Sequence, residues 1–80
     1  MTLVELTEMI VKSLVSDPDS ISVKEFSNDD EIIIEVVVKE EDMGSVIGRE
    51  GKIANSIRTV VQASSYLKDN KRVKINISSF

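Results

Sequence analysis

The sequence predicts an α+β domain in which three helices lie on one face of a mixed three-stranded sheet. Apolar residues recur every three or four positions near the N-terminus and again after position 52, the period of an amphipathic helix. They alternate with polar residues over 31–39 and 72–78, the period of a half-buried strand. The 80 residues suffice for one domain with a small core, and we assign it to 1–80.

The N-terminal half predicts a helix followed by a hairpin. Thr2 and Glu5 have the spacing of a capping box, and Pro18 ends the helix because proline cannot continue the hydrogen-bond ladder. A short strand over 21–26 and a turn over 27–30 lead into the strand 31–39. The apolar stripe of the helix is Leu3, Leu6, Ile10 and Leu14, and the inward residues of the second strand are Ile32, Ile34, Val36 and Val38.

The C-terminal half predicts two helices and a strand. We expect Asp42 to cap a short helix over 43–47 that stops at Gly48. A second helix opens near Lys52 and runs to about Ser65, with Ala54, Ile57 and Val61 toward the core. A crossover through helices on one sheet face joins parallel strands, so strands 31–39 and 72–78 should be parallel and the hairpin strand antiparallel. The order is helix, strand, strand, helix, helix, strand.

Composition narrows the classes of function. The chain has no cysteine and no histidine, which removes disulfides, thiol nucleophiles, Ser–His dyads and nearly every transition-metal site. No apolar stretch approaches a membrane span and no signal peptide is recognisable, so we expect a cytoplasmic location. The net charge of −4 argues against strong non-specific binding to nucleic acid or acidic membranes. Basic residues nevertheless gather in 49–58 and 68–74, and the acidic runs suit turns better than a magnesium site.

The stretch VIGREGKI, residues 46–53, interrupts an otherwise apolar segment with two glycines around a charged pair. It lacks the first glycine and the Ser or Thr of a phosphate-binding loop, and it lacks the first glycine of a dinucleotide fingerprint. One interpretation is a plain turn between helices. The other is a backbone that approaches phosphates, helped by the N-terminus of the next helix and by Lys52. A GXXG loop in this element order is typical of a KH domain, where it clamps about four nucleotides of a single strand.

The segment DMGSVIGREGKIANSIRTVVQA, with the basic turn and the KRVKINI strand after it, resembles the small bacterial KhpA-type KH proteins of the type II order. The resemblance covers essentially the whole chain. It implies single-stranded RNA binding without catalysis, a homodimer, and a heterodimer with a larger KhpB (Jag/EloR-like) protein. In some Gram-positive bacteria that pair influences cell elongation and division, which would connect the chain to cell shape and cell wall biogenesis.

The resemblance assigns roles to residues of the loop. Gly48 and Gly51 become the clamp glycines, Ile47 the apolar residue before them, and Lys52 the basic residue after them. Arg49 and Glu50 stand where the family usually has two basic residues, or one basic and one small residue. Glu50 therefore weakens the attraction for phosphate. We expect the loop to be exposed enough that replacing both glycines by Asp would leave most of the fold intact.

Other residues extend the predicted site. Arg58 could reach a phosphate, and bases would rest in an aliphatic groove lined by Val36, Val38, Ile47 and Ala54. The aromatic residues Phe26, Tyr66 and Phe80 lie away from the loop in sequence, so stacking on rings is not expected to be the main mode of binding. A dimer interface is predicted on the outer side of the second helix of the pair, at Ser56, Thr59, Val60 and Ala63.

The sequence thus predicts a non-catalytic single-stranded RNA-binding protein, an RNA chaperone or post-transcriptional regulator that acts as a dimer. We identify no catalytic residue, metal site or cofactor, and no membrane partner. One alternative is a dimerisation adaptor whose RNA binding resides mainly in a KhpB-like partner. Another is a small regulatory domain that binds a mononucleotide through the glycine loop.

Overall fold

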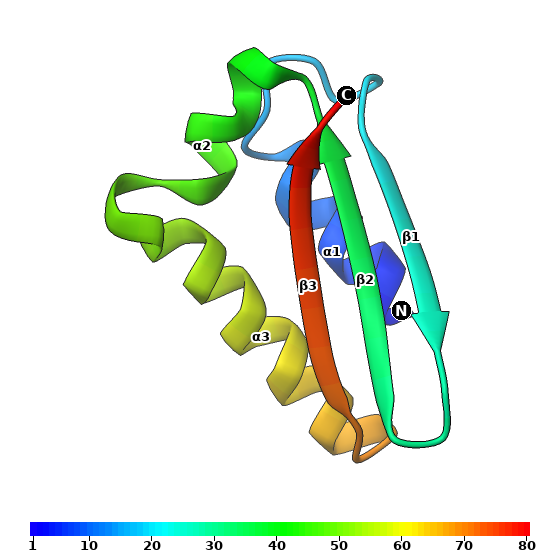
Figure 1. Cartoon of the computed structure of the whole chain (residues 1–80). Helices are drawn as coiled ribbons and strands as arrows, with labels where there is room; N and C mark the ends of the chain where they lie inside the picture. The colour runs from blue at the N-terminus through cyan, green and yellow to red at the C-terminus, as the bar shows by residue number, and fades with distance from the viewer.

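The computed structural model describes all 80 residues and has the predicted order of elements (Figure 1). Two short 3-10 turns, η1 and η2, precede the second and third helices. No helix is long and apolar enough to cross a bilayer. The elements are α1 (Leu3–Lys12), β1 (Ser22–Ser27), β2 (Glu31–Val38), η1 (Glu40–Asp42), α2 (Met43–Ile47), η2 (Arg49–Gly51), α3 (Lys52–Lys68) and β3 (Arg72–Ser79).

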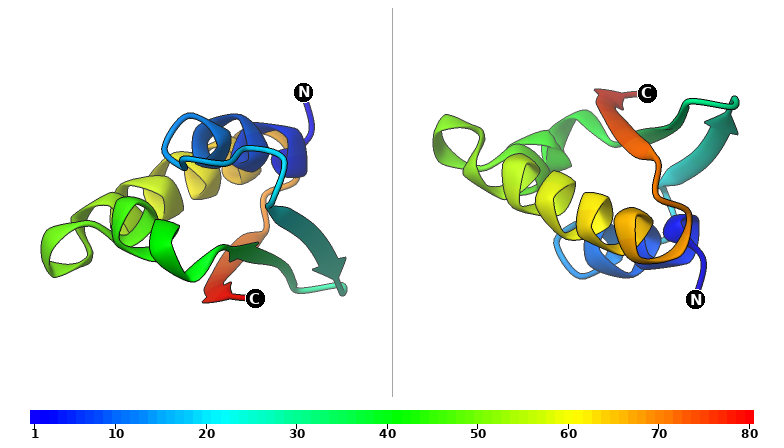
Figure 2. Two further views of the ribbon diagram at one scale, coloured as in Figure 1. Left: turned by 90° about the horizontal axis from the view of Figure 1, so that it is seen from above. Right: turned by 90° about the horizontal axis from the view of Figure 1, so that it is seen from below.

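The sheet has the order β1-β2-β3, with β1 antiparallel and β3 parallel to the central strand β2. Ile34 of β2 lies opposite Glu25 of β1 and Ile75 of β3. The helices lie on one side of the sheet and leave the other face open (Figure 2). The predicted α+β class, with three helices on one face of a mixed three-stranded sheet, is therefore confirmed. It is the helix-strand-strand-helix-helix-strand order of a type II KH domain.

The core lies between β2 and the helices. The alternate β2 residues Ile32, Ile34, Val36 and Val38 are all at most 4 % exposed, as the strand pattern predicts. In α1 the buried residues are Leu3, Thr7 and Val11, whereas the predicted Leu6 and Ile10 are only partly buried. Thr7 was not predicted in the core because the predicted stripe contains only apolar residues. Its Oγ1 donates to the Leu3 carbonyl at 2.8 Å, so the hydroxyl is satisfied inside the core.

Asp42 has a different role from the one predicted. Its side chain makes no capping hydrogen bond to α2. Oδ1 instead accepts from the backbone N–H of Ser16 at 3.0 Å and from the Ser16 hydroxyl at 2.8 Å, although Asp42 is only 4 % exposed. These two donors favour the charged carboxylate and hold the pKa of Asp42 below its usual value. Asp42 thus ties the α1–β1 connection to the start of α2, and so helps to place the glycine loop.

This tie predicts a pH-dependent contribution to stability. Because the folded-state pKa of Asp42 is lowered, its contribution is present above the unfolded-state value near 3.8 and is lost as pH falls through the folded pKa. Asp42→Asn should therefore unfold at a lower temperature than the wild type at pH 7, and the gap should shrink below about pH 4. Thermal unfolding of both proteins from pH 7 to pH 3 measures this. A difference in unfolding temperature that stays constant over that range would show that the ionised Asp42 carboxylate does not stabilise the fold.

Candidate nucleic-acid interface

The glycine loop between α2 and α3 is a tight turn with three residues of positive φ. Gly48 has φ 75° and ψ 176°, Glu50 has φ 57° and ψ 24°, and Gly51 has φ 74° and ψ 14°. The Gly48 N–H donates to the Gly44 carbonyl at 2.9 Å, and the Gly51 N–H donates to the Gly48 carbonyl at 3.2 Å. The turn reverses the chain so that α3 starts at the tip of the molecule (Figure 1).

The two glycines are needed for different reasons. A Cβ at Gly48 would lie 2.6 Å from Ile53 Cγ1, and its φ and ψ fall in a region open essentially to glycine alone. A Cβ at Gly51 would meet nothing nearer than Asn55 Nδ2 at 3.9 Å. This strain argues against the expectation that Gly48 could be replaced with the fold intact, which stays a prediction. Gly51 leaves open surface at the start of α3.

Three charged side chains surround that open surface. Arg49, Glu50 and Lys52 are all exposed, and none of them forms a salt bridge. The positive charges of Arg49 and Lys52 and the negative charge of Glu50 are thus accessible to a ligand at the N-terminus of the 17-residue helix α3. Ile47 is partly buried behind them, and Ala54 is 3 % exposed, so Ala54 belongs to the core rather than to the surface.

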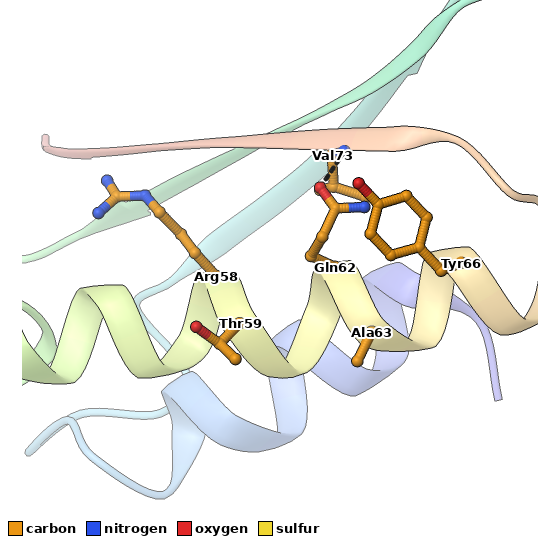
Figure 3. A pocket seen from close by; sticks show the side chains of 6 residues that line it. All are labelled: Arg58, Thr59, Gln62, Ala63, Tyr66 and Val73. Atoms are coloured by element: carbon orange, nitrogen blue, oxygen red, sulfur yellow. Dashed lines mark hydrogen bonds between the residues drawn. The ribbon is translucent and has the colours of Figure 1, made fainter.

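The aliphatic groove does not lie where the sequence placed it. Val36 and Val38 are 1 % and 0 % exposed beneath the helices, because β2 is the central strand, so they cannot receive a base. A hollow of about 430 Å³ lies instead between α3 and the edge strand β3 (Figure 3). We call this hollow the α3–β3 groove. It is lined by Arg58, Thr59, Gln62, Ala63, Tyr66 and Val73.

Side chains of α3 cover the free edge of β3 along this groove. Gln62 accepts at Oε1 from the Val73 N–H at 2.8 Å (Figure 3). It also donates from Nε2 to the Lys71 carbonyl at 3.0 Å. Arg58 donates to the Ile75 carbonyl at 3.3 Å and to Asn55 Oδ1 at 3.2 Å. These bonds resemble those of a further strand and hold the groove walls together. Arg58 remains exposed with further donors, so it is available to a ligand.

Three residues of this groove were missed from the sequence: Gln62, Tyr66 and Val73. Gln62 and Tyr66 recur with Arg58 every four positions, which places the three on one flank of α3 next to the core stripe. That spacing was the available signal. It was overlooked because the three side chains differ in chemistry. Gln62 and Tyr66 also lie more than ten residues after the glycine loop in sequence, although they are on the helix that begins there.

The predicted dimer residues divide between the two flanks of α3. Thr59 and Ala63 line the α3–β3 groove. Ser56 and the 48 % exposed Val60 line a second hollow of about 310 Å³ between α1 and α3. We call this the α1–α3 hollow, and its other lining residues are Ile10, Leu14, Ile53 and Ile57. No three His, Cys, Asp or Glu side chains lie close enough together to hold a metal ion.

Fold and loop together define a KH domain of the type II order, and comparison with known proteins supports this. Two structures of Era match at 20 % identity. One is a complex with MgGDPNP and nucleotides 1506–1542 of 16S ribosomal RNA, with a TM-score of 0.68 over 96 % of this chain. The other is an Aquifex aeolicus Era variant bound to GDP·AlF4⁻, with a TM-score of 0.71 over 98 %. This chain spans only 29 % and 30 % of those proteins, so the likeness is one of fold.

The family follows from the sequence. The family model "KhpA/KhpB, KH domain" matches residues 4–77, and the chain belongs to this non-catalytic family. "RNA-binding protein KhpA" of Clostridium perfringens is 49 % identical, with 91 % of this chain and 96 % of that protein covered. The proteins of the same name from Borreliella burgdorferi and Thermotoga maritima are 40 % and 34 % identical, covering 92 % and 91 % of this chain and 89 % and 95 % of their own.

The different demands on the two glycines predict different costs of substitution. Gly48→Ala should destabilise the fold by about 1–3 kcal/mol through backbone strain alone, and displacement of Ile53 should add to this. Gly51→Asn should cost less than about 1 kcal/mol, since asparagine tolerates the left-handed conformation and the site is open. Urea unfolding of the two variants tests the ranking. Equal losses would mean that contact with Ile53 does not constrain the turn.

Proposed function

We propose that the chain binds single-stranded RNA along a path that runs from the glycine loop into the α3–β3 groove. The observation that supports this most is the position of exposed Arg49 and Lys52 beside the open surface of Gly51, at the N-terminus of α3. Backbone N–H groups and the helix dipole attract phosphate there. The relatives named RNA-binding protein KhpA agree with this ligand.

The RNA backbone would pass over the loop, and its bases would turn into the groove. Arg58 lies about 1.7 turns beyond Lys52 on α3, so its guanidinium can meet the next phosphate or a base edge at the mouth of the groove. Ile47 supports the loop from behind. Val36, Val38 and Ala54 contribute only as the core under it. Binding through one domain is weak, because Glu50 opposes the two loop cations.

A role as an RNA chaperone or post-transcriptional regulator fits weak binding without catalysis. The second candidate is a dimerisation adaptor whose partner, a KhpB-like protein, supplies most of the RNA affinity. Glu50 and the net charge of −4 favour this candidate, since both reduce attraction for RNA. A mononucleotide site at the same loop is a third outcome. It would appear as stabilisation of the fold by nucleoside phosphates without binding of an RNA strand.

Charge changes at the loop test the RNA site. Lys52→Glu should weaken binding of a single-stranded RNA decamer at least five-fold, whereas Glu50→Gln should strengthen it, because both side chains are exposed and unpaired. The wild-type plot of log affinity against log salt should have a slope of about −1 to −3, at roughly −0.7 per neutralised phosphate. Fluorescence anisotropy with a labelled oligonucleotide measures all three.

The control for these variants is Lys12→Glu, an exposed charge change on α1 that breaks a surface pair with Glu8. It should leave RNA affinity unchanged. If Lys52→Glu and Lys12→Glu bind equally well, the loop is not the RNA site. No measurable binding by the wild type, together with binding in the presence of a KhpB-like protein, would favour the adaptor role.

We further propose that the chain dimerises through the α1–α3 hollow. Val60 is an apolar residue at the rim of a hollow that is itself lined mostly by apolar side chains. In a two-fold symmetric pair, Val60 of each subunit can therefore enter the hollow of the other. Ser56 allows close approach of the helices, and Thr59 and Ala63 lie toward the edge of the contact. A KH domain of a KhpB-like partner would use the same face.

Val60→Asp should give a folded monomer, because a carboxylate cannot enter an apolar hollow unpaired. Light scattering should show the mass falling from that of a dimer to about half. RNA affinity should also fall, because two linked sites bind more tightly than one. The matched control is Phe26→Asp, since Phe26 is 52 % exposed and pairs with Ile33 on the open sheet face. A Val60→Asp protein that remains dimeric would exclude this face.

A further inference from the structure

Tyr66 lies in the α3–β3 groove, far from the glycine loop along α3. It follows Lys52 by 14 residues, which corresponds to about 21 Å of helix. Its ring projects from α3 toward β3 beside Gln62 and Val73 (Figure 3). We infer that Tyr66 stacks on a nucleobase and forms a second base-binding position, so that the RNA contact extends beyond the clamp at the loop. This inference rests on the proposed function.

The surroundings of Tyr66 suit stacking. The residue is 55 % exposed, so a large part of its ring is open to a ligand. Gln62 beside it is held at both amide atoms by backbone groups of Lys71 and Val73, and Val73 is partly buried, so the floor of the groove is preorganised. Ala63 adds little bulk. An exposed ring over a rigid floor is how proteins hold bases of a single strand without reading their sequence.

Charge favours RNA as the occupant. The chain next to Tyr66, residues 68–74, carries four basic residues and one acidic residue, although the protein as a whole has a net charge of −4. Arg72 and Lys74 alternate with the groove residue Val73 along β3, so they lie on the open face of the sheet, where they are exposed and form no salt bridge. Arg58, six residues after Lys52 on α3, lines the end of the groove nearer the loop. Helix α3 carries no acidic residue between Lys52 and Tyr66, so a strand clamped at Gly51 can extend along it without meeting a carboxylate of the helix.

The composition of the chain makes this inference directly measurable. Tyr66 is the only tyrosine and there is no tryptophan, so tyrosine emission reports on this residue alone. A single-stranded RNA decamer should quench the emission at saturation, after correction with adenosine monophosphate of equal absorbance. Tyr66→Ala should weaken decamer binding at least five-fold, the low end of the stacking contribution of one base. Tyr66→Phe should bind like the wild type, because stacking needs the ring and not the hydroxyl.

The matched control is Phe26→Ala, which removes a half-exposed ring from the open sheet face. It should bind the decamer like the wild type. Unquenched emission in the bound state, equal weakening by Tyr66→Ala and Tyr66→Phe, or equal weakening by Phe26→Ala would each overturn the stacking role. Wild-type affinity in Tyr66→Ala would do the same. Failure of the proposed function looks different: the wild type then binds no decamer, or Lys52→Glu leaves its affinity unchanged.

Discussion

The chain reversal at Gly48 is the constraint on which the proposed RNA-binding face depends. Its backbone adopts φ 75° and ψ 176°, and the space where a side chain would stand is already filled by Ile53 at the start of α3. Contact with Ile53 thus couples the direction of α3 to the end of α2. Gly51 is then placed at the surface with Arg49 and Lys52 around it, so one internal contact positions the whole proposed clamp.

Helix α3 also protects the free edge of β3, which forms the other wall of the proposed site. Through Gln62 and Arg58, α3 satisfies edge groups of β3 that would otherwise face solvent or attract another strand. Arg58 and Gln62, which make these bonds, also line the groove. Helix α3 therefore presents three flanks: one to the core, one that protects the edge of β3 and lines the proposed RNA path, and one to the α1–α3 hollow.

Electrostatics limit what such a small domain can do alone. The acidic residues lie mainly in the turns. Asp17 pairs with Lys39 at 3.1 Å, and Asp42 accepts two hydrogen bonds from Ser16, so some of the acidic side chains stabilise the fold. The basic loop residues Arg49 and Lys52 form no salt bridge, whereas Lys68 and Lys71, near the turn before β3, donate to the carbonyls of Met1 and Asn28. A protein with this balance gains affinity by combining weak sites, along one strand or between two subunits, rather than by general attraction for nucleic acid.

The sequence by itself determined the order of elements, the fold class, the parallel crossover and the family. These follow from local periodicity, from the spacing of the glycines and from a motif that lies within one continuous segment. It also identified the loop residues from Ile47 to Lys52 as neighbours, because they are adjacent in the chain.

Only the tertiary structure decided which faces are accessible. Val36 and Val38 are buried because the helices pack over them. Asp42 accepts a hydrogen bond from Ser16, which is 26 positions away in the sequence. Thr7 can be buried because its hydroxyl donates to a carbonyl one turn earlier in α1. Gln62 and Tyr66 become groove residues only when α3 lies against β3. Each of these outcomes depends on contacts between segments distant in sequence, or on the satisfaction of a buried polar group, and periodicity carries no information about either.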